Sequence, residues 1–346
     1  MKSDEASIEC HRAFLEKDNE EPLIGAIRGW ENLSRYVPDT GSFFPKGDVS
    51  AEDLSADRFQ RLYEAWTTML NEPDVLFRTL EPLPFFPWAE AAMGCRVVYT
   101  GKNFWSSPPD GPVDDQTGDP WLKRYGELLD FLAERFGGEY PIGQPILRGP
   151  LDLAAAVFGE EQMIYRLYDH PEEMKAFLKR AADVFLRFVQ VQHERSPVFL
   201  GGSVVGSYYI WTPGSCIRLQ EDAMALLSPD LYREFGHPVD CRIAEAAEYT
   251  LFHMHATVLH LLDVLLENTG LQIIQVSKDE GVGLGAILES LKTIQSAGFC
   301  LIVKGRFSNE EVRVLKSELV GRGLCIQGVV LTEKETDDFY AYFQAK

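Results

Sequence analysis

The chain has 346 residues, of which 45% are hydrophobic and 25% are charged, as is ordinary for a globular protein with a large core. Its 53 acidic and 33 basic residues give a formal net charge of -20, so neither a nucleic acid nor a membrane surface is expected as a partner. Six cysteines without a C-x-x-C pair, a charged N-terminus and the lack of an apolar run of about 18 residues favour a reducing, cytoplasmic setting.

Apolar periodicity along the chain predicts strands that alternate with helices. Residues 1–21 are interpreted as a polar or helical arm, and one further domain is expected over residues 22–346. Short apolar runs predict strands near residues 22, 96, 145, 198, 251, 271, 299 and 324. Helical spacing of apolar residues predicts helices over about 52–70, 121–136, 149–158, 171–194, 228–248, 257–268, 285–297, 309–321 and 333–344.

This order of elements favours an α/β protein with a parallel sheet. The number of strand–helix units indicates a single (β/α)8 TIM barrel with an N-terminal helical extension. An open doubly wound sheet is the alternative. The glycine-rich fingerprint usual for dinucleotide binding is missing, however, since Gly281-Val-Gly283-Leu-Gly285 has the wrong spacing.

The strand predicted near residue 251 ends in two histidines, His253 and His255. Side chains at positions i and i+2 of a strand share one face, about 6.6 Å apart along the backbone. Strand ends of this kind form the active site in a (β/α)8 barrel. The two imidazoles are therefore candidate metal ligands, and the alternative is a hydrogen-bonded pair without a metal.

A catalytic zinc site normally uses three protein ligands. The candidates for the third ligand are Cys325, on the last predicted strand, and Asp279 and Glu280, just after the strand that follows the histidines. The sequence alone leaves the choice among these three open.

Further side chains near strand ends are candidates for substrate binding. The arginines among them would converge at the mouth of a barrel and suit a carboxylate-bearing substrate, or pair with acidic residues of the rim. The aromatic residues would line a pocket for a flat or methylated ligand, or pack over the rim. The candidates are Arg28, Trp88, Arg148, Tyr208, Trp211, Arg218, Gln275 and Arg306.

Several motifs resemble the uroporphyrinogen decarboxylase superfamily. Gly149-Pro-Leu-Asp-Leu-Ala-Ala-Ala-Val-Phe-Gly159 is similar to its GPxTLAxxLxG stretch, and Leu227-Ser-Pro-Asp-Leu-Tyr-Arg-Glu-Phe-Gly-His-Pro238 is similar to its SPexyreFvlP helix. Phe252-His-Met-His255 falls where that superfamily has a strand ending in a histidine. The resemblance covers about residues 20–345 and implies a (β/α)8 barrel.

The superfamily has two well-known branches. Its metal-free decarboxylases carry an RQAGRYLP segment, with which Arg28-Gly-Trp-Glu-Asn-Leu-Ser-Arg-Tyr-Val-Pro38 shares two arginines at a different spacing. Its corrinoid-dependent methyltransferases move a methyl group between a cobalamin and a thiol, and they bind zinc through His-x-Cys and a later Cys. The matching positions are His253, His255 and, a few residues early, Cys325.

The resemblance to the methyltransferase branch implies metal-binding and catalytic roles for His253 and His255. It also implies zinc as the metal, a thiol-like acceptor, and methylcobalamin carried by a separate corrinoid protein. The alternatives are a metal-free decarboxylase that acts on a polycarboxylate, and a ligand-binding barrel without catalytic activity. A homodimer is left open.

Overall fold

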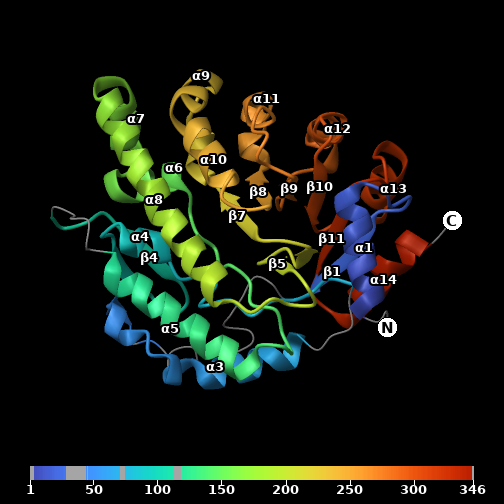
Figure 1. Ribbon diagram of the computed structural model, residues 1–346. Coiled ribbons are helices and arrows are strands. Elements are labelled where there is room, and N and C mark those ends of the chain that lie inside the picture. Colours follow the sequence, from blue (N-terminus) through green and yellow to red (C-terminus); the bar gives the residue numbers. More distant parts are fainter. Residues whose placement is uncertain (1–3, 29–43, 45, 71–74, 112–117, 345–346) are drawn as a thin grey trace.

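The computed structural model describes residues 4–28, 44, 46–111 without 71–74, and 118–344. At its centre is a parallel sheet of six strands in the order β1-β11-β10-β9-β8-β7 (Figure 1). The strands of this sheet are β1 (Leu23–Arg28), β7 (Cys216–Gln220), β8 (Tyr249–His255), β9 (Ile273–Lys278), β10 (Cys300–Gly305) and β11 (Leu324–Val330). They are rich in β-branched residues and mostly buried, as expected for a parallel sheet that is covered on both faces.

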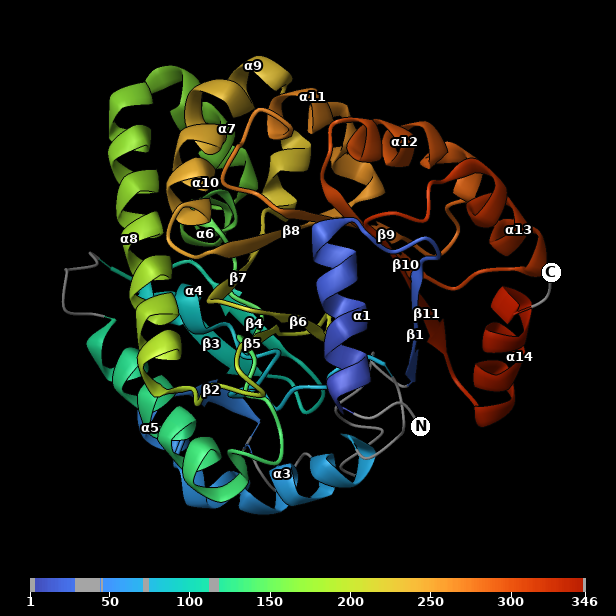
Figure 2. The ribbon, with the colours of Figure 1, turned by 45° about the vertical axis from the view of Figure 1, so that its right-hand side comes forward.

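Helices surround the sheet, and Figure 2 shows α8, α10, α12, α13 and α14 on its outside. The helices are α1 (Asp4–Glu16), α3 (Ala56–Leu70), α4 (Trp88–Ala92), α5 (Asp119–Phe136), α6 (Pro150–Phe158), α7 (Glu160–Asp169), α8 (Pro171–Arg195), α9 (Pro229–Leu231), α10 (His237–Ala244), α11 (Leu262–Leu265), α12 (Leu288–Ser296), α13 (Asn309–Glu318) and α14 (Glu333–Gln344). Across the described ranges, none of these helices combines the length and the apolar character that crossing a bilayer requires.

The remaining strands of the described residues form two smaller antiparallel sheets. One consists of β2 (Gly47–Val49), β3 (Arg96–Tyr99) and β4 (Phe104–Ser107), and the other of β5 (Ser203–Val205) and β6 (Ile210–Thr212). The turn of the β5–β6 hairpin lies against the inner face of the main sheet. There the side chain of Gln327 donates a hydrogen bond to Tyr208 O at 2.6 Å.

The predicted α/β fold with parallel strands is confirmed, and so are its strands near residues 22, 251, 271, 299 and 324. The strand near residue 96 exists, but it belongs to the small sheet with β2 and β4. The strand predicted near residue 198 is wrong, because Val198 is 74% exposed and Phe199 turns back onto Gly202. The strand predicted near residue 145 is also wrong, since residues 143–149 have no regular structure.

The sheet is open between β7 and β1, where the described residues contain no strand that closes it. At the free edge of β7, the side-chain amide of Gln144 bonds to the backbone of Arg218, as a neighbouring strand would. Its Nε2 donates to Arg218 O at 2.7 Å, and its Oε1 accepts from Arg218 N at 3.1 Å. The predicted TIM barrel is thus confirmed only as a parallel α/β sheet, because at this edge β7 bonds to the Gln144 side chain and to the backbone N–H of Gly149, outside any regular strand.

The predicted N-terminal arm is helix α1, and it packs on the body of the protein. Phe14 is fully buried, and so is His11. The backbone N–H of Trp211, on β6, donates to His11 Nδ1 at 3.0 Å, and Nε2 of the same ring lies 2.9 Å from Val75 O. This histidine therefore has a structural role, with its Nε2–H as the donor to the carbonyl group.

Candidate metal centre and adjoining cavity

The two histidines of β8 lie at the carboxyl end of the parallel sheet. His253 pairs in register with Gln220 of β7 on one side and with Gln275 of β9 on the other. His253 is buried, whereas the His255 side chain is 37% exposed. The predicted common face is confirmed, because the Nε2 atoms of the two rings lie 3.1 Å apart.

The Nδ1 atom of each ring contacts an oxygen acceptor from β9 or the residue after it. His253 Nδ1 contacts Gln275 Oε1, and His255 Nδ1 lies 2.6 Å from Asp279 Oδ1. A carbonyl or carboxylate oxygen accepts a hydrogen bond, so Nδ1 carries the proton in both rings. When both rings are neutral, their two Nε2 lone pairs are free and 3.1 Å apart, and a cation bound to both stabilises this arrangement.

Asp222 brings a carboxylate to the same place. Its Oδ1 is 3.9 Å from His255 Nε2, and its Oδ2 accepts a hydrogen bond from Gln220 Nε2 at 2.7 Å. One ligand atom from each of Asp222, His253 and His255 lies within 4.8 Å of the others. Two imidazoles and one carboxylate form a donor set that occurs in catalytic zinc sites.

The protein environment keeps His253 neutral. Its burial lowers the pKa of His253 well below the usual value, and the positive charge of Arg218 lowers it further. A neutral imidazole with a free Nε2 is the form that binds a metal. Imidazole nitrogens bind zinc at about 2.0–2.1 Å, so one ion can contact both Nε2 atoms. The residues present therefore fit a divalent cation.

The structure separates the three candidates for the third ligand. Cys325 is fully buried on β11 within an apolar cluster that includes Ile302, and it is not part of the group around the histidines. Glu280 is exposed. Asp279 contacts the Nδ1 side of His255 and so orients the ring. The third member of the group, the carboxylate of Asp222, was not among these candidates.

Asp222 was missed because strand β7 was missed. The run Cys216-Ile-Arg-Leu-Gln220 contains two polar residues, and their side chains are buried and hydrogen-bonded to each other, Arg218 Nη2 to Gln220 Oε1 at 2.6 Å. Its alternation of apolar and polar residues was the available signal for a strand. A strand that ends at Gln220 beside β8 places Asp222 next to His255.

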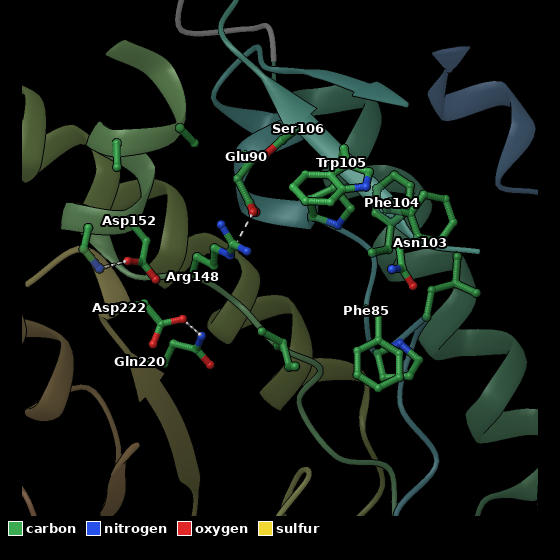
Figure 3. A pocket seen from close by; sticks show the side chains of 18 of the residues that line it. Phe85, Glu90, Asn103, Phe104, Trp105, Ser106, Arg148, Asp152, Gln220 and Asp222 are labelled. Carbon is green, nitrogen blue, oxygen red and sulfur yellow. Dashed lines mark hydrogen bonds and ion pairs between the residues drawn. The ribbon is translucent and has the colours of Figure 1, made fainter. Parts of the chain in front are cut away.

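A cavity of about 750 Å³ adjoins this group of residues. Gln220 and Asp222 line it, and Asp222 is therefore shared between the cavity and the histidine pair. Figure 3 shows Asp152 and Asp222 near Arg148 on one side, and the aromatic rings of Phe85 and of Phe104 and Trp105 on β4 on the other. A ligand in this cavity would lie beside Asp222, one of the three possible metal ligands.

The predicted aromatic candidates take different positions. Trp88 is fully buried in α4 and donates from Nε1 to Pro82 O at 2.8 Å, so it is a core residue outside the cavity lining. Trp211 is also buried and donates to Phe199 O at 3.1 Å. Tyr208 lies beside the histidines, with its ring centroid 5.8 Å from that of His253.

The arginine candidates do not all reach the cavity. Arg148 lines it, with Nε 3.4 Å from Glu90 Oε1. Arg218 is buried outside the cavity lining, and its guanidinium carbon lies 5.3 Å from the Tyr208 ring centroid. Arg306 is 58% exposed and pairs with Glu335 at 3.4 Å. The Arg28 side chain lies outside the described residues, although its backbone pairs with Val330.

Gln275 orients a histidine, as described above, and is fully buried. Its Nε2 donates to Ser277 Oγ at 3.2 Å, which fixes the direction of the amide group. The structure places this residue behind the His253 ring and outside the cavity lining.

Comparison with solved structures shows the fold. A methyltransferase from Methanosarcina mazei matches over 97% of this chain and 98% of that chain, with a TM-score of 0.65 and 14% sequence identity. A scan against protein-family models finds no match, and a search of curated proteins finds none either. At this level of identity, the two chains share a fold over nearly their whole lengths.

Proposed function

We propose that this protein is a zinc-dependent methyltransferase, with His253, His255 and Asp222 as the metal ligands. The observation that carries the proposal is the pair of Nε2 atoms 3.1 Å apart on rings whose Nδ1 atoms already have acceptors. The cavity beside Asp222 supports it, because a small-molecule substrate there would meet the metal. The structural likeness to a methyltransferase supports the reaction class.

Bound zinc would lower the pKa of a thiol and hold it as the thiolate that accepts a methyl group. Gln275 and Asp279 keep the Nδ1 proton on each histidine and so present Nε2 to the metal. Gln220 holds one oxygen of Asp222 and leaves the other directed towards His255.

The donor of the methyl group in this proposal is methylcobalamin on a separate corrinoid protein, as the resemblance to the methyltransferase branch implies. The same resemblance supports membership of the uroporphyrinogen decarboxylase superfamily and a (β/α)8 barrel, of which the six parallel strands would be the regular part. Cys325, buried in its apolar cluster, has no role in this proposal.

A direct assay tests the reaction class. The protein as isolated is mixed with free methylcobalamin and one thiol, which is 2-mercaptoethanol, cysteamine or 3-mercaptopropionate. Demethylation of the cobalamin is followed by absorbance in each of the three reactions. We expect turnover with at least one thiol, its loss in His253→Ala, and its retention in His170→Ala, which changes a half-exposed surface histidine. No turnover by zinc-loaded wild type, or equal rates in the two variants, would refute the proposal.

A further inference from the structure

The cavity beside the possible metal centre has an unusual balance of charge. Its described lining contains four carboxylates and two cationic groups, namely Glu90, Asp152, Glu160, Asp222, Lys102 and Arg148. Three of these carboxylates share one cation, Arg148, since Glu90, Asp152 and Asp222 all raise its pKa against the opposing effect of burial. An anionic ligand would therefore meet an excess of negative charge.

Two buried carboxylate oxygens in this lining have no hydrogen-bond partner among the described residues. They are Oε2 of Glu90, a residue that is 2% exposed, and Oδ2 of Asp152, which is 4% exposed. The second oxygen of each carboxylate is engaged, by Arg148 Nε for Glu90 and by the backbone N–H of Ala223 for Asp152. A buried oxygen without a donor is costly, so a ligand that supplies one gains binding energy here.

Burial also raises the pKa of Glu90, and the positive charge of Arg148 opposes this shift without cancelling it. A cation in the cavity beside Glu90 would stabilise the ionised form of its carboxylate.

The opposite wall of the cavity is aromatic and partly exposed. Trp105 is 65% exposed and Phe85 is 41% exposed, and both line the cavity together with Phe104. Figure 3 shows these rings on the opposite side of the view from Asp152, with Glu90 between them. Aromatic faces attract both apolar groups and cations.

We infer that the cavity binds an organic cation: an ammonium group that donates to Glu90 and Asp152, attached to an apolar body that packs on Phe85, Phe104 and Trp105. This inference rests on the proposed function only in naming that ligand as the substrate, because the binding itself needs no metal. It assigns a substrate class opposite in charge to the polycarboxylate expected from the arginines.

Three probes of similar shape test the charge preference. Binding of 2-phenylethylammonium, 2-phenylethanol and 3-phenylpropanoate to the full chain is measured by isothermal titration calorimetry at pH 7.5. We expect the ammonium ion to bind at least about tenfold more tightly than the carboxylate, with the alcohol between them. Tighter or equal binding of 3-phenylpropanoate, or no binding of the ammonium ion to folded protein, would overturn the inference.

Two variants locate the binding. Glu90→Gln should weaken binding of the ammonium ion about tenfold and leave that of the alcohol nearly unchanged, whereas the exposed control Glu139→Gln should change neither. Trp105→Ala, at an exposed position, should weaken all three and remains informative if Glu90→Gln does not fold. An ammonium ion that binds both variants as tightly as wild type would contradict the assignment of these residues.

The same titration on His253→Ala, together with the zinc content of wild type, separates this inference from the proposed function. If His253→Ala and wild type both bind the ammonium ion but wild type holds no metal, only the proposed metal-dependent reaction fails. If the wild type holds zinc and binds no ammonium ion, only the substrate class fails.

Discussion

His253 and His255 face each other through their Nε2 atoms at 3.1 Å, while Gln275 and Asp279 engage the Nδ1 atoms behind them. Two neutral rings in this arrangement have no proton to share between them, and their lone pairs repel. With a carboxylate oxygen of Asp222 3.9 Å from His255 Nε2, a divalent cation removes that repulsion. The neighbours of the rings thus prepare both histidines for the same ligand.

The contact between Asp279 and His255 should control the affinity for the metal. Asp279→Ala removes the acceptor that holds His255 Nδ1–H, so we expect zinc affinity to fall about 10–100-fold. Asp279→Asn keeps an acceptor oxygen and should lose less. Competition with a chromophoric zinc chelator measures both. Asp263→Ala, an exposed aspartate of α11, serves as the control, and zinc affinity as low in this variant as in Asp279→Ala would contradict a specific positioning role.

Glu81 should make the stability of the protein depend on pH. Burial raises the pKa of Glu81 to about 7 from an ordinary 4.5, although Thr79 and Ser207 donate hydrogen bonds to it. Between these values the unfolded chain releases the proton while the folded protein keeps it, so the free energy of unfolding falls as pH rises through this window. The whole effect amounts to about 3 kcal/mol.

Urea unfolding of Glu81→Gln at pH 5 and pH 8 measures this contribution. At each pH, the free energy of unfolding of wild type is subtracted from that of the variant. This difference should be larger at pH 8 than at pH 5, by up to about 3 kcal/mol. Other buried carboxyls such as Asp240 titrate in both proteins and cancel in the difference. Glu52→Gln, at an exposed position, should follow wild type at both pH values. A Glu81→Gln profile parallel to wild type would show that Glu81 ionises normally.

Substitution of Trp88 and of Trp105 should affect the stability of the protein very differently. Trp88→Ala removes a fully buried ring that packs edge-on against Tyr125 at 5.2 Å, and we expect a loss of about 3–5 kcal/mol in stability. Trp105→Ala changes a ring that is 65% exposed and should alter stability by less than about 0.5 kcal/mol. Chemical denaturation compares the two, and similar losses in both variants would contradict these assignments.

The histidine pair could be predicted from the sequence because the two-residue period of a strand depends only on local geometry. Asp222 could not be predicted in the same way. Its position follows from the pairing of β7 with β8, which places Gln220 beside His253. That pairing is a tertiary relationship, and the polar side chains of Arg218 and Gln220 obscured the strand that makes it.

The same limit explains the sheet. The strands after residue 249 were predicted well, because β8 to β11 are consecutive in the chain, apolar and regular. Near the open edge, Gln144 satisfies the backbone of β7 through its side chain, which no apolar pattern can reveal. Similarly, tertiary packing decides that Trp88 is buried in the core and that Trp105 lines the cavity, which local sequence does not determine.

Metal analysis tests the central claim most directly. The protein is purified without chelator, and its zinc content per chain is measured by mass spectrometry beside His253→Ala, His255→Ala, Asp222→Ala and the surface control His170→Ala. We expect about one zinc per chain in wild type and in His170→Ala, and a large loss in the other three while they remain folded by circular dichroism. Metal-free wild type that also fails to take up added zinc, or equal zinc in His253→Ala and wild type, would contradict the account.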